Sequence, residues 1–149
     1  DPGCPIQIVS TGHSKVIIGI KTRQKLNTLT PDFSNLITLS RTLGCNGYFV
    51  FTFDSGDPGA LTAGRMFAPA VGLNEDPVTG NAHGPLGAYL VHHKLVETKG
   101  PVFKFTGKQG EAMHRTGRVE VIVHIENAEP VKVQVSGNAV IVFETELAI

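Results

Sequence analysis

The chain has 149 residues, and 13 lysines and arginines balance 13 aspartates and glutamates, so the formal net charge is zero. A neutral chain lacks the basic surface typical of nucleic-acid binding and the polybasic segment that attaches a protein to a membrane. Hydrophobic residues make up 41% of the sequence, and no apolar run is long enough to span a bilayer. We therefore expect one globular domain without a nucleic-acid or membrane partner.

The start of the chain and its cysteines bear on processing and on compartment. The segment from Asp1 to Pro5 has no initiator methionine, and it lacks the basic and apolar regions of a signal peptide. We therefore expect a fragment or a processed chain. Cys4 and Cys45 have neither a metal-binding spacing nor the pattern of a disulfide framework, which favours structural thiols and a cytoplasmic location.

In the first half of the chain, glycines and prolines separate short periodic segments. Apolar runs predict strands over residues 7–9, 15–20, 47–53 and 63–68. Between them, helical spacing of apolar residues predicts a helix that begins at Thr30-Pro31-Asp32, with proline at its first position, and ends at Gly44 as a C-terminal cap. Residues 69–79 are interpreted as a polar loop.

The second half begins with a helix predicted over residues 81–93, whose apolar and small residues lie on nearly every face. Such a helix is buried all round, and Pro85 is expected near its first turn. Alternating or continuous apolar residues then predict strands over 102–105, 119–125, 131–135 and 140–143, with Gly137-Asn138 as a turn between the last two. The pattern indicates an α+β fold in which strands enclose one of the helices.

The segment before this second helix carries the clearest chemical signal. Glu75 and Asp76 precede the helix start, Thr79 or Asn81 is placed to cap the helix, and Gly80 allows a ligand to approach the backbone. The first N–H groups of a helix have no intrahelical partner and lie at the positive end of its dipole, so a substrate carboxylate fits there. Asp76 would then accept or shuttle a proton.

A structural interpretation of the same residues stays open. Asp-Pro is a common turn pair, Thr or Asn before a helix is a common cap, and acidic residues near a helix start are frequent. His83, in the first turn, either helps to orient a substrate or is a capping or solvated histidine. Gln109 lies between two glycines after a strand, where it either reaches a cleft or belongs to a simple turn. No segment has the pattern of a zinc site, a dinucleotide fingerprint or a phosphate loop.

Several segments together resemble one known family. Glu75-Asp76-Pro77-Val78-Thr79-Gly80-Asn81-Ala82 resembles the E-D-P-V-T-G-S-A signature of PhzF-like proteins, and Arg65-Met66-Phe67-Ala68-Pro69 with Gly72 resembles the lead-in to it. Gly107-Lys108-Gln109-Gly110 resembles the family's glutamine-glycine segment, and Gly12-His13 and Gly44-Cys45-Asn46-Gly47 occur where similar segments do. The resemblance runs from about Pro5 to the end of the chain and is nearest to the YddE-type branch.

The resemblance implies a two-domain protein with the diaminopimelate-epimerase fold, of which residues 1–149 would be the C-terminal domain. Each half is expected to be a curved mixed β-sheet around a central helix, with the active site in the cleft between the halves. It also implies a cofactor-independent and metal-independent isomerase or epimerase that moves a proton on a small carboxylate-bearing substrate. The main acid/base, a glutamate, would belong to the missing N-terminal half.

The resemblance also implies roles for individual residues. Asp76 would be catalytic, while Thr79, Gly80, Asn81, Ala82, His83 and Gln109 would bind the substrate or support its binding. Asn81 stands where the family has serine, and an amide hydrogen-bonds but does not relay a proton as a hydroxyl does. Neither cysteine lies in the 75–82 segment, which argues against a racemase with two thiols.

The resemblance also leads to expectations about assembly and activity, because the N-terminal half would be absent. The apolar segment from Asn138 to Leu147 would be a last strand that returns towards the first half. Without that neighbour, its edge is expected to recruit a partner, so that the chain forms a homodimer or larger assembly or holds a separate N-terminal half. The isolated chain is expected to show no isomerase activity. A non-catalytic binding or scaffold protein that keeps the fold is the alternative.

Overall fold

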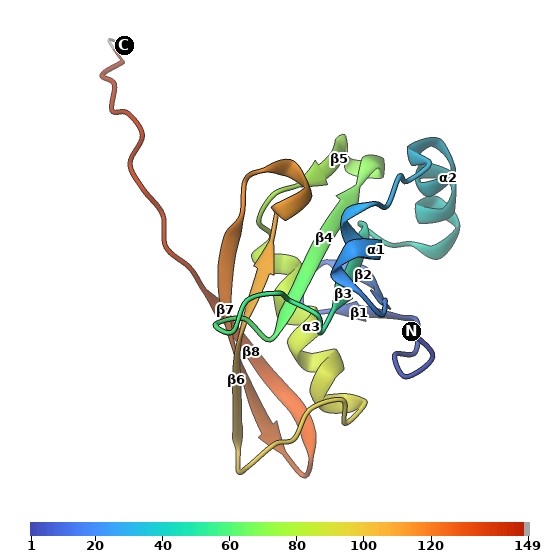
Figure 1. Cartoon of the computed structure of the whole chain (residues 1–149), viewed down its shortest axis with the longest axis vertical. Coiled ribbons are helices and arrows are strands. Elements are labelled where there is room, and N and C mark those ends of the chain that lie inside the picture. The colour runs from blue at the N-terminus through green and yellow to red at the C-terminus, as the bar shows by residue number, and fades with distance from the viewer. Residues whose placement is uncertain (148–149) are drawn as a thin grey trace.

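The computed structural model describes residues 1–147, which form one curved eight-stranded sheet wrapped around a helix (Figure 1). The strands are β1 (Gln7–Ser10), β2 (Ser14–Gly19), β3 (Tyr48–Thr52), β4 (Thr62–Ala68), β5 (Leu73–Asp76), β6 (Val102–Gln109), β7 (Gly117–Glu126) and β8 (Glu129–Ser136). The helices are α1 (Arg23–Asn27), α2 (Phe33–Leu43) and α3 (Gly80–His92), with short 3-10 turns at Pro69–Val71 and Glu111–Met113. The predicted α+β class and the curved mixed sheet are confirmed.

The sheet has the strand order β1-β2-β3-β4-β6-β7-β8, and β5 is an additional strand that pairs with β4. Parallel pairs join β2 to β3 and β4 to β6, whereas the other pairs are antiparallel. The crossover between β2 and β3 contains α1 and α2, and the crossover between β4 and β6 contains α3. These crossovers place helices on both faces of the sheet.

The inner face of the sheet packs on α3, and this contact forms the main core. Most residues of α3 are buried, among them the fully buried Leu86 and Leu90, as expected for a helix that is apolar on nearly every side. β7 alternates strictly, so that Val121 and Val123 face α3 while their neighbours face outward. Pro85 is the sixth residue of the helix, just after its first turn, which agrees with the expected placement near that turn.

A second, smaller core lies on the outer face of β2, β3 and β4. Leu26 of α1 packs there with Val50, Ala63 and Phe67, and α2 adds partly buried residues. Because this part of the sheet has helices on both sides, every residue of β3 is buried. The continuous apolar strand that the sequence shows at residues 48–52 is explained by this double cover.

Two elements of the structure were missed by sequence reasoning. α1 has only five residues, too few for a helical period, and its start is capped by Thr22, whose hydroxyl accepts a hydrogen bond from Lys25 N. β5 lies where a polar loop was predicted. Its residues are partly exposed and mostly polar, so the sequence has no apolar strand pattern there. α2 begins after Asp32, which caps it, so Pro31 precedes the cap, whereas Gly44 ends the helix in the left-handed conformation as predicted.

A buried ion pair holds β5 against the rest of the sheet. Arg65 Nε and Nη2 each donate to one carboxylate oxygen of Glu75, both at 2.8 Å. The remaining nitrogen, Nη1, donates to the carbonyl oxygens of Leu26 and Leu29 at 3.0 and 2.9 Å. Arg65 therefore joins β4, β5 and the end of α1, and its planar guanidinium suits this set of acceptors.

The pairing of β4 with β5 contains a bulge. Asp76 lies opposite Met66 and Leu73 lies opposite Ala68, so two residues of β5 stand opposite Phe67 alone. The shift determines which side chains of β5 lie on each face of the sheet.

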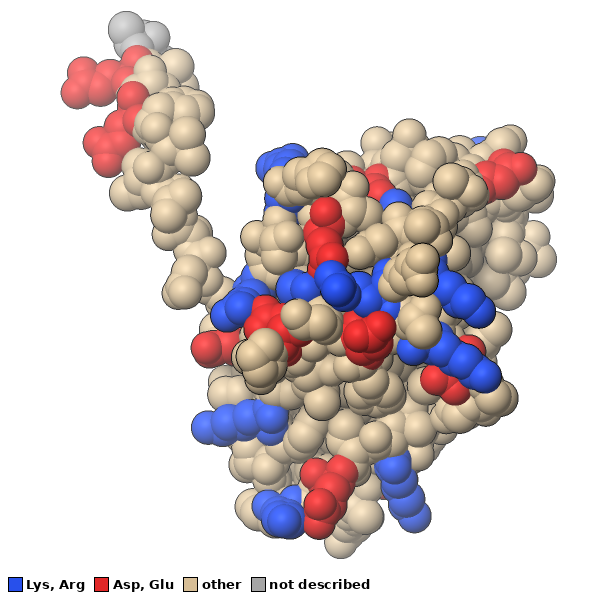
Figure 2. All heavy atoms as spheres, in the orientation of Figure 1, with Lys and Arg blue, Asp and Glu red and all other residues tan. Residues whose placement is uncertain are grey.

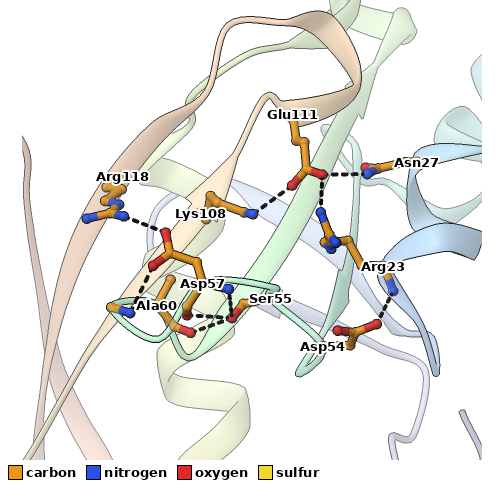
Figure 3. A network of polar contacts seen from close by, with 10 residues as sticks. Arg23, Asn27, Asp54, Ser55, Asp57, Ala60, Lys108, Glu111 and Arg118 are labelled. Carbon is orange, nitrogen blue, oxygen red and sulfur yellow. Dashed lines mark hydrogen bonds and ion pairs between the residues drawn. The ribbon is translucent and has the colours of Figure 1, made fainter.

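The outer surface carries charges of both signs, which Figure 2 shows interspersed over one face of the molecule. Glu111 is the centre of a network there (Figure 3), with Arg23 Nη1 at 2.5 Å, Lys108 Nζ at 2.6 Å and Asn27 Nδ2 at 3.0 Å. The Lys108 ammonium, and then Arg23 and Asn27, hold the pKa of Glu111 below its usual range. The network fastens α1 to the end of β6.

The predicted strand at residues 140–143 is wrong for this chain. Residues 137–147 lie outside any strand and extend away from the body of the molecule (Figure 1). Val140 and Phe143 are 84% and 79% exposed. A strand needs a neighbour for its backbone groups, and none of residues 1–136 pairs with this segment. No helix among residues 1–147 is long and apolar enough to cross a membrane.

The Arg65–Glu75 pair makes the first prediction. Glu75→Ala leaves the buried guanidinium without its counter-charge, so the free energy of unfolding should fall by about 3–5 kcal/mol. Urea unfolding measures this loss. Glu97→Ala is the matched control, because Glu97 is exposed and its removal should change stability by less than about 0.5 kcal/mol. Equal effects of the two substitutions would contradict the structural role of Glu75.

Candidate functional site

The two adjacent carboxylates of β5 have different surroundings because neighbouring residues of a strand face opposite ways. Glu75 is on the outer face, where it binds Arg65. Asp76 lies opposite Met66, which belongs to the inner core around α3. Glu75 therefore has a structural role in the pair with Arg65, whereas Asp76 lies on the side of the sheet on which α3 begins.

A set of hydrogen bonds fixes the turn between Asp76 and α3. Gln109 is fully buried at the end of β6, and its Nε2 donates to Asp76 O at 2.5 Å and to Thr79 Oγ1 at 3.1 Å. Its Oε1 accepts from Thr79 N at 3.2 Å. Thr79 Oγ1 in turn donates to Asp76 Oδ2. Thr79 occupies the N-cap position, but its hydroxyl serves Asp76 rather than the helix.

These contacts leave one oxygen of Asp76 available. No hydrogen bond joins Asp76 Oδ1 to any part of the chain from residue 1 to 147, although Oδ2 is held by Thr79. The backbone N–H groups of Gly80 and Asn81 likewise have no acceptor within the described chain, whereas Ala82 N donates to Thr79 O at 3.1 Å. A carboxylate oxygen and two helix-terminal donors are thus presented together.

A pocket of about 310 Å³ lies at this end of α3. Its polar side chains come from three parts of the chain that are far apart in sequence: His13 and Lys15, then Asn46, then Asp76, Thr79 and Asn81. Apolar side chains of β4, β5 and the turn between them complete the lining, namely Met66, Ala68, Val71 and Leu73. The arrangement suits a small ligand that has an apolar body and few polar groups.

His83 is placed differently from the other candidate residues. It is fully buried in α3 and does not line the pocket. Its Nδ1 is 2.9 Å from Thr79 O, so Nδ1 carries the proton and donates it, while Nε2 has no partner among residues 1–147. Burial lowers the pKa of His83 to about 4, against a smaller opposing effect of the hydrogen bond to Thr79. His83 is therefore neutral at physiological pH, and its hydrogen bond to Thr79 O helps to hold the turn before α3.

Gly107 makes room for this imidazole. A Cβ atom at Gly107 would lie 2.2 Å from His83 Cδ2, a distance that atoms do not adopt without a shift of the ring or of the strand. The glycine before Lys108-Gln109 is thus required by the packing of His83.

The structure brings together Asp76, Thr79, Gly80 and Asn81, the part of the proposed site nearest to the helix start. Ala82, His83 and Gln109 lie behind this surface, fully or almost fully buried. The pocket residues His13, Lys15 and Asn46 were not proposed as functional. Lys15 offered one signal, a charged residue directly before the apolar run Val16–Ile18. Among residues 1–147, no three His, Cys, Asp or Glu side chains lie close enough to hold a metal ion.

A curved mixed sheet around a buried helix is one half of the diaminopimelate-epimerase fold, and solved structures show the likeness. A PhzF-family phenazine biosynthesis protein from Bacillus anthracis superposes with a TM-score of 0.76 and 24% identity, over 91% of this chain and 50% of that one. A hydroxyproline epimerase from Agrobacterium vitis superposes with a TM-score of 0.62 and 12% identity, over 87% of this chain and 40% of that one. At these identities the likeness establishes the fold.

Sequence comparison identifies the family. The chain belongs to the phenazine biosynthesis-like proteins, whose family model matches residues 1–145. An uncharacterized isomerase of Clostridium acetobutylicum is 60% identical over 97% of this chain and 48% of its own length. The Escherichia coli K12 uncharacterized isomerase YddE is 49% identical over 99% and 49%, which confirms the YddE-type resemblance. A trans-2,3-dihydro-3-hydroxyanthranilate isomerase of Pseudomonas fluorescens is 30% identical over 94% and 46%.

The chain spans about half the length of the curated relatives that it matches. The pocket at the start of α3 is therefore described for this half alone.

The burial of His83 makes a prediction about acid stability. Its pKa is about 4 in the folded chain and 6.5 when unperturbed, so between these pH values the unfolded chain binds more protons. The free energy of unfolding should consequently fall as the pH is lowered from 6.5 to 4, by about 3 kcal/mol from this residue. Urea unfolding of the wild type and of His83→Asn, which keeps a donor for Thr79 O, measures the difference. Equal losses in the two proteins would show that His83 is not buried in its neutral form.

Proposed function

We propose that this chain is the C-terminal domain of a two-domain isomerase or epimerase that moves a proton on a small carboxylate-bearing substrate without a cofactor. The observation that carries the proposal is the unpartnered Oδ1 of Asp76, in a pocket at the start of α3. A carboxylate whose other oxygen is held by Thr79 is fixed in orientation and ready to exchange a proton. Relatives that are named isomerases support this class of reaction.

In this proposal, the start of α3 binds the substrate carboxylate. The N–H groups of Gly80 and Asn81 donate to it, and the positive end of the helix dipole adds to the attraction. The side chain of Asn81, which is exposed and lines the pocket, contributes a further hydrogen bond. Asp76 then removes or returns the proton at the neighbouring carbon.

His83 and Gln109 act on the substrate through Thr79. Gln109 holds Thr79 N and Oγ1, and His83 holds Thr79 O. Together they position both the hydroxyl that orients Asp76 and the first turn of α3. Their burial explains why they support the binding surface without lining it.

The second half supplies what this chain lacks in the proposal. Proton transfer between two positions or two faces of a carbon requires an acid as well as a base, and Asp76 provides one group. The other half would contribute the second group, the glutamate implied by the family resemblance, and close a cleft over the pocket. The buried free thiols of Cys4 and Cys45 fit the expected cytoplasmic location.

Reconstitution tests the catalytic role of Asp76. The chain is co-expressed with the half of the Clostridium acetobutylicum relative that it does not match, and deuterium uptake from D2O is followed by NMR. The probes are trans-2,3-dihydro-3-hydroxyanthranilate and a panel of small amino and hydroxy acids. We expect exchange by the pair and none by the chain alone. Asp76→Asn keeps the side-chain volume and should lower the exchange rate by about 10² or more.

Glu126→Gln is the matched control for charge, since Glu126 is exposed at the end of β7. It should leave the exchange rate unchanged. An active pair with unaltered exchange in Asp76→Asn would remove Asp76 from the mechanism. Exchange by the pure chain would refute the need for the other half. A correctly assembled pair that exchanges no probe would favour the non-catalytic binding or scaffold alternative.

The exposed segment after β8 makes a prediction about assembly. Five large apolar side chains between residues 140 and 147 are at least 79% exposed, and such a segment recruits a partner. We expect the isolated chain to form a dimer or larger assembly in light scattering, and a chain that ends at Gly137 to be monomeric. Val140→Lys with Val142→Lys keeps the length and should also give monomers. A clean monomer of the unaltered chain at high concentration would refute this expectation.

A further inference from the structure

Lys15 differs from the other buried cations of the fold. Among residues 1–147, the buried lysines and arginines are Lys15, Arg65 and Lys108, with exposed fractions of 4%, 7% and 7%. Arg65 pairs with Glu75 and Lys108 pairs with Glu111. Lys15 Nζ pairs with no carboxylate of the described chain, and its one hydrogen-bond contact is Ser14 O at 3.5 Å.

A buried ammonium without a counter-charge destabilises the folded state, because the charge has lost its hydration and gained no equivalent partner. Burial accordingly lowers the pKa of Lys15, and the nearby Cys45 acts in the opposite direction. A methionine at this position of β2 could be buried without the free-energy cost of desolvating a charge. The amine of Lys15 is therefore best explained by a group that enters the pocket and pairs with it.

The surroundings of Lys15 show where such a group would lie. Lys15 and Asn46 line the same pocket as Asp76 and Asn81, and the volume of about 310 Å³ leaves room for a small ligand between them. The hairpin that joins β1 to β2 lies against α3, because a Cβ at Gly84 would lie 3.4 Å from Thr11 Oγ1. Lys15 and the start of α3 are therefore two walls of one site.

Asn46 adds a neutral donor on the same wall. Its side-chain amide contacts Ser14 Oγ at 3.2 Å, the hydroxyl that also contacts Gly44 O at 3.1 Å, and the amide keeps at least one N–H that donates to no residue among 1–147. Lys15 and Asn46 thus offer an ammonium and an amide N–H, and Met66, Val71 and Leu73 add apolar contacts to the lining. These features fit a compact ligand with one anionic group and a hydrocarbon body.

We propose that Lys15 is the anion-binding residue of the site, where its ammonium pairs with the substrate carboxylate that the start of α3 also binds. This inference rests on the proposed function, since it concerns the same pocket. When the C–H bond beside the carboxylate breaks, the proton moves to Asp76 Oδ1 and the electron pair moves onto the carboxylate, whose charge rises from −1 to −2. The attraction of Lys15 therefore increases as the proton leaves, which is the condition for catalysis.

Binding of acetate to the chain tests the proposal without any turnover. Acetate is titrated against the ¹⁵N-labelled chain, and the amide signals of Gly80 and Asn81 report on the site. We expect Lys15→Met to weaken acetate binding at least tenfold and to raise the midpoint of thermal unfolding by about 2 °C or more. Lys104→Met removes the same charge from an exposed position of β6 and should change neither quantity. Acetamide, which has a similar size and no charge, should bind at least tenfold more weakly than acetate.

Further arms separate this inference from the proposed function. Asp76→Asn removes a like charge from the pocket and should tighten acetate binding, whatever its effect on deuterium exchange. Equal acetate affinity in the wild type and in Lys15→Met would overturn the assignment of Lys15, while the exchange experiment would still judge Asp76. Loss of acetate binding when the other half is added would show that the assembled site does not hold the anion at Lys15, which also overturns the proposal. Unchanged exchange in Asp76→Asn with Lys15-dependent acetate binding would sink the proposed function alone.

Discussion

The bidentate pair between Arg65 and Glu75 is the contact on which the geometry of the site depends. Among the described strands, β5 pairs with β4 alone, so backbone hydrogen bonds of the sheet give its position little support. Arg65 supplies that support by binding Glu75 and, with its third nitrogen, carbonyl oxygens at the end of α1. Asp76, the next residue, lines the pocket. A contact on the outer face of the sheet thus determines where a carboxylate lies on the inner face.

Most hydrogen bonds of the site involve Thr79. Thr79 uses its N–H, its hydroxyl and its carbonyl on Gln109, Asp76 and His83, so the turn before α3 has little freedom. Among residues 1–147, Asp76 Oδ1 accepts no hydrogen bond and the ammonium of Lys15 pairs with no carboxylate, and both residues line one pocket. A negative and a positive group held apart in a partly apolar cavity suit a reaction in which a proton and its bonding electrons separate.

Local patterns in the sequence were sufficient to predict the helices and strands whose apolar residues repeat regularly. The alternation of residues 119–125 and the apolar surface of α3 predicted a strand and a buried helix correctly, because burial there follows a regular repeat. α1 and β5 were missed because α1 is too short for a helical period and β5 is mostly polar, while the contacts of Arg65 with both segments come from a distant part of the chain that no local pattern records. The strand expected at residues 140–143 had the right composition but pairs with no strand in the described part of the chain.

The candidate site was predicted in part for the same reason. Asp76, Thr79 and Asn81 are contiguous with a helix start, where the physics of helix ends indicates an anion site. His13, Lys15 and Asn46 reach the pocket only through the parallel pairing of β2 with β3, which depends on the whole crossover. In sequence, Lys15 is one lysine beside an apolar run, and only the three-dimensional structure shows that no carboxylate of residues 1–147 pairs with it.

The bulge between β4 and β5 has a consequence for insertions and deletions in this chain. Because side chains of a strand alternate between faces, a one-residue insertion between Pro69–Val71 and β5 would move Glu75 into the place of Asp76, and Asn74 would then lie beside Arg65. A one-residue deletion would instead place Asp76 beside Arg65 and Pro77 at the pocket. Substitutions at the exposed Val71 or Leu73 leave this relation intact. The geometry of the site therefore depends on the number of residues in this connection more than on their identity.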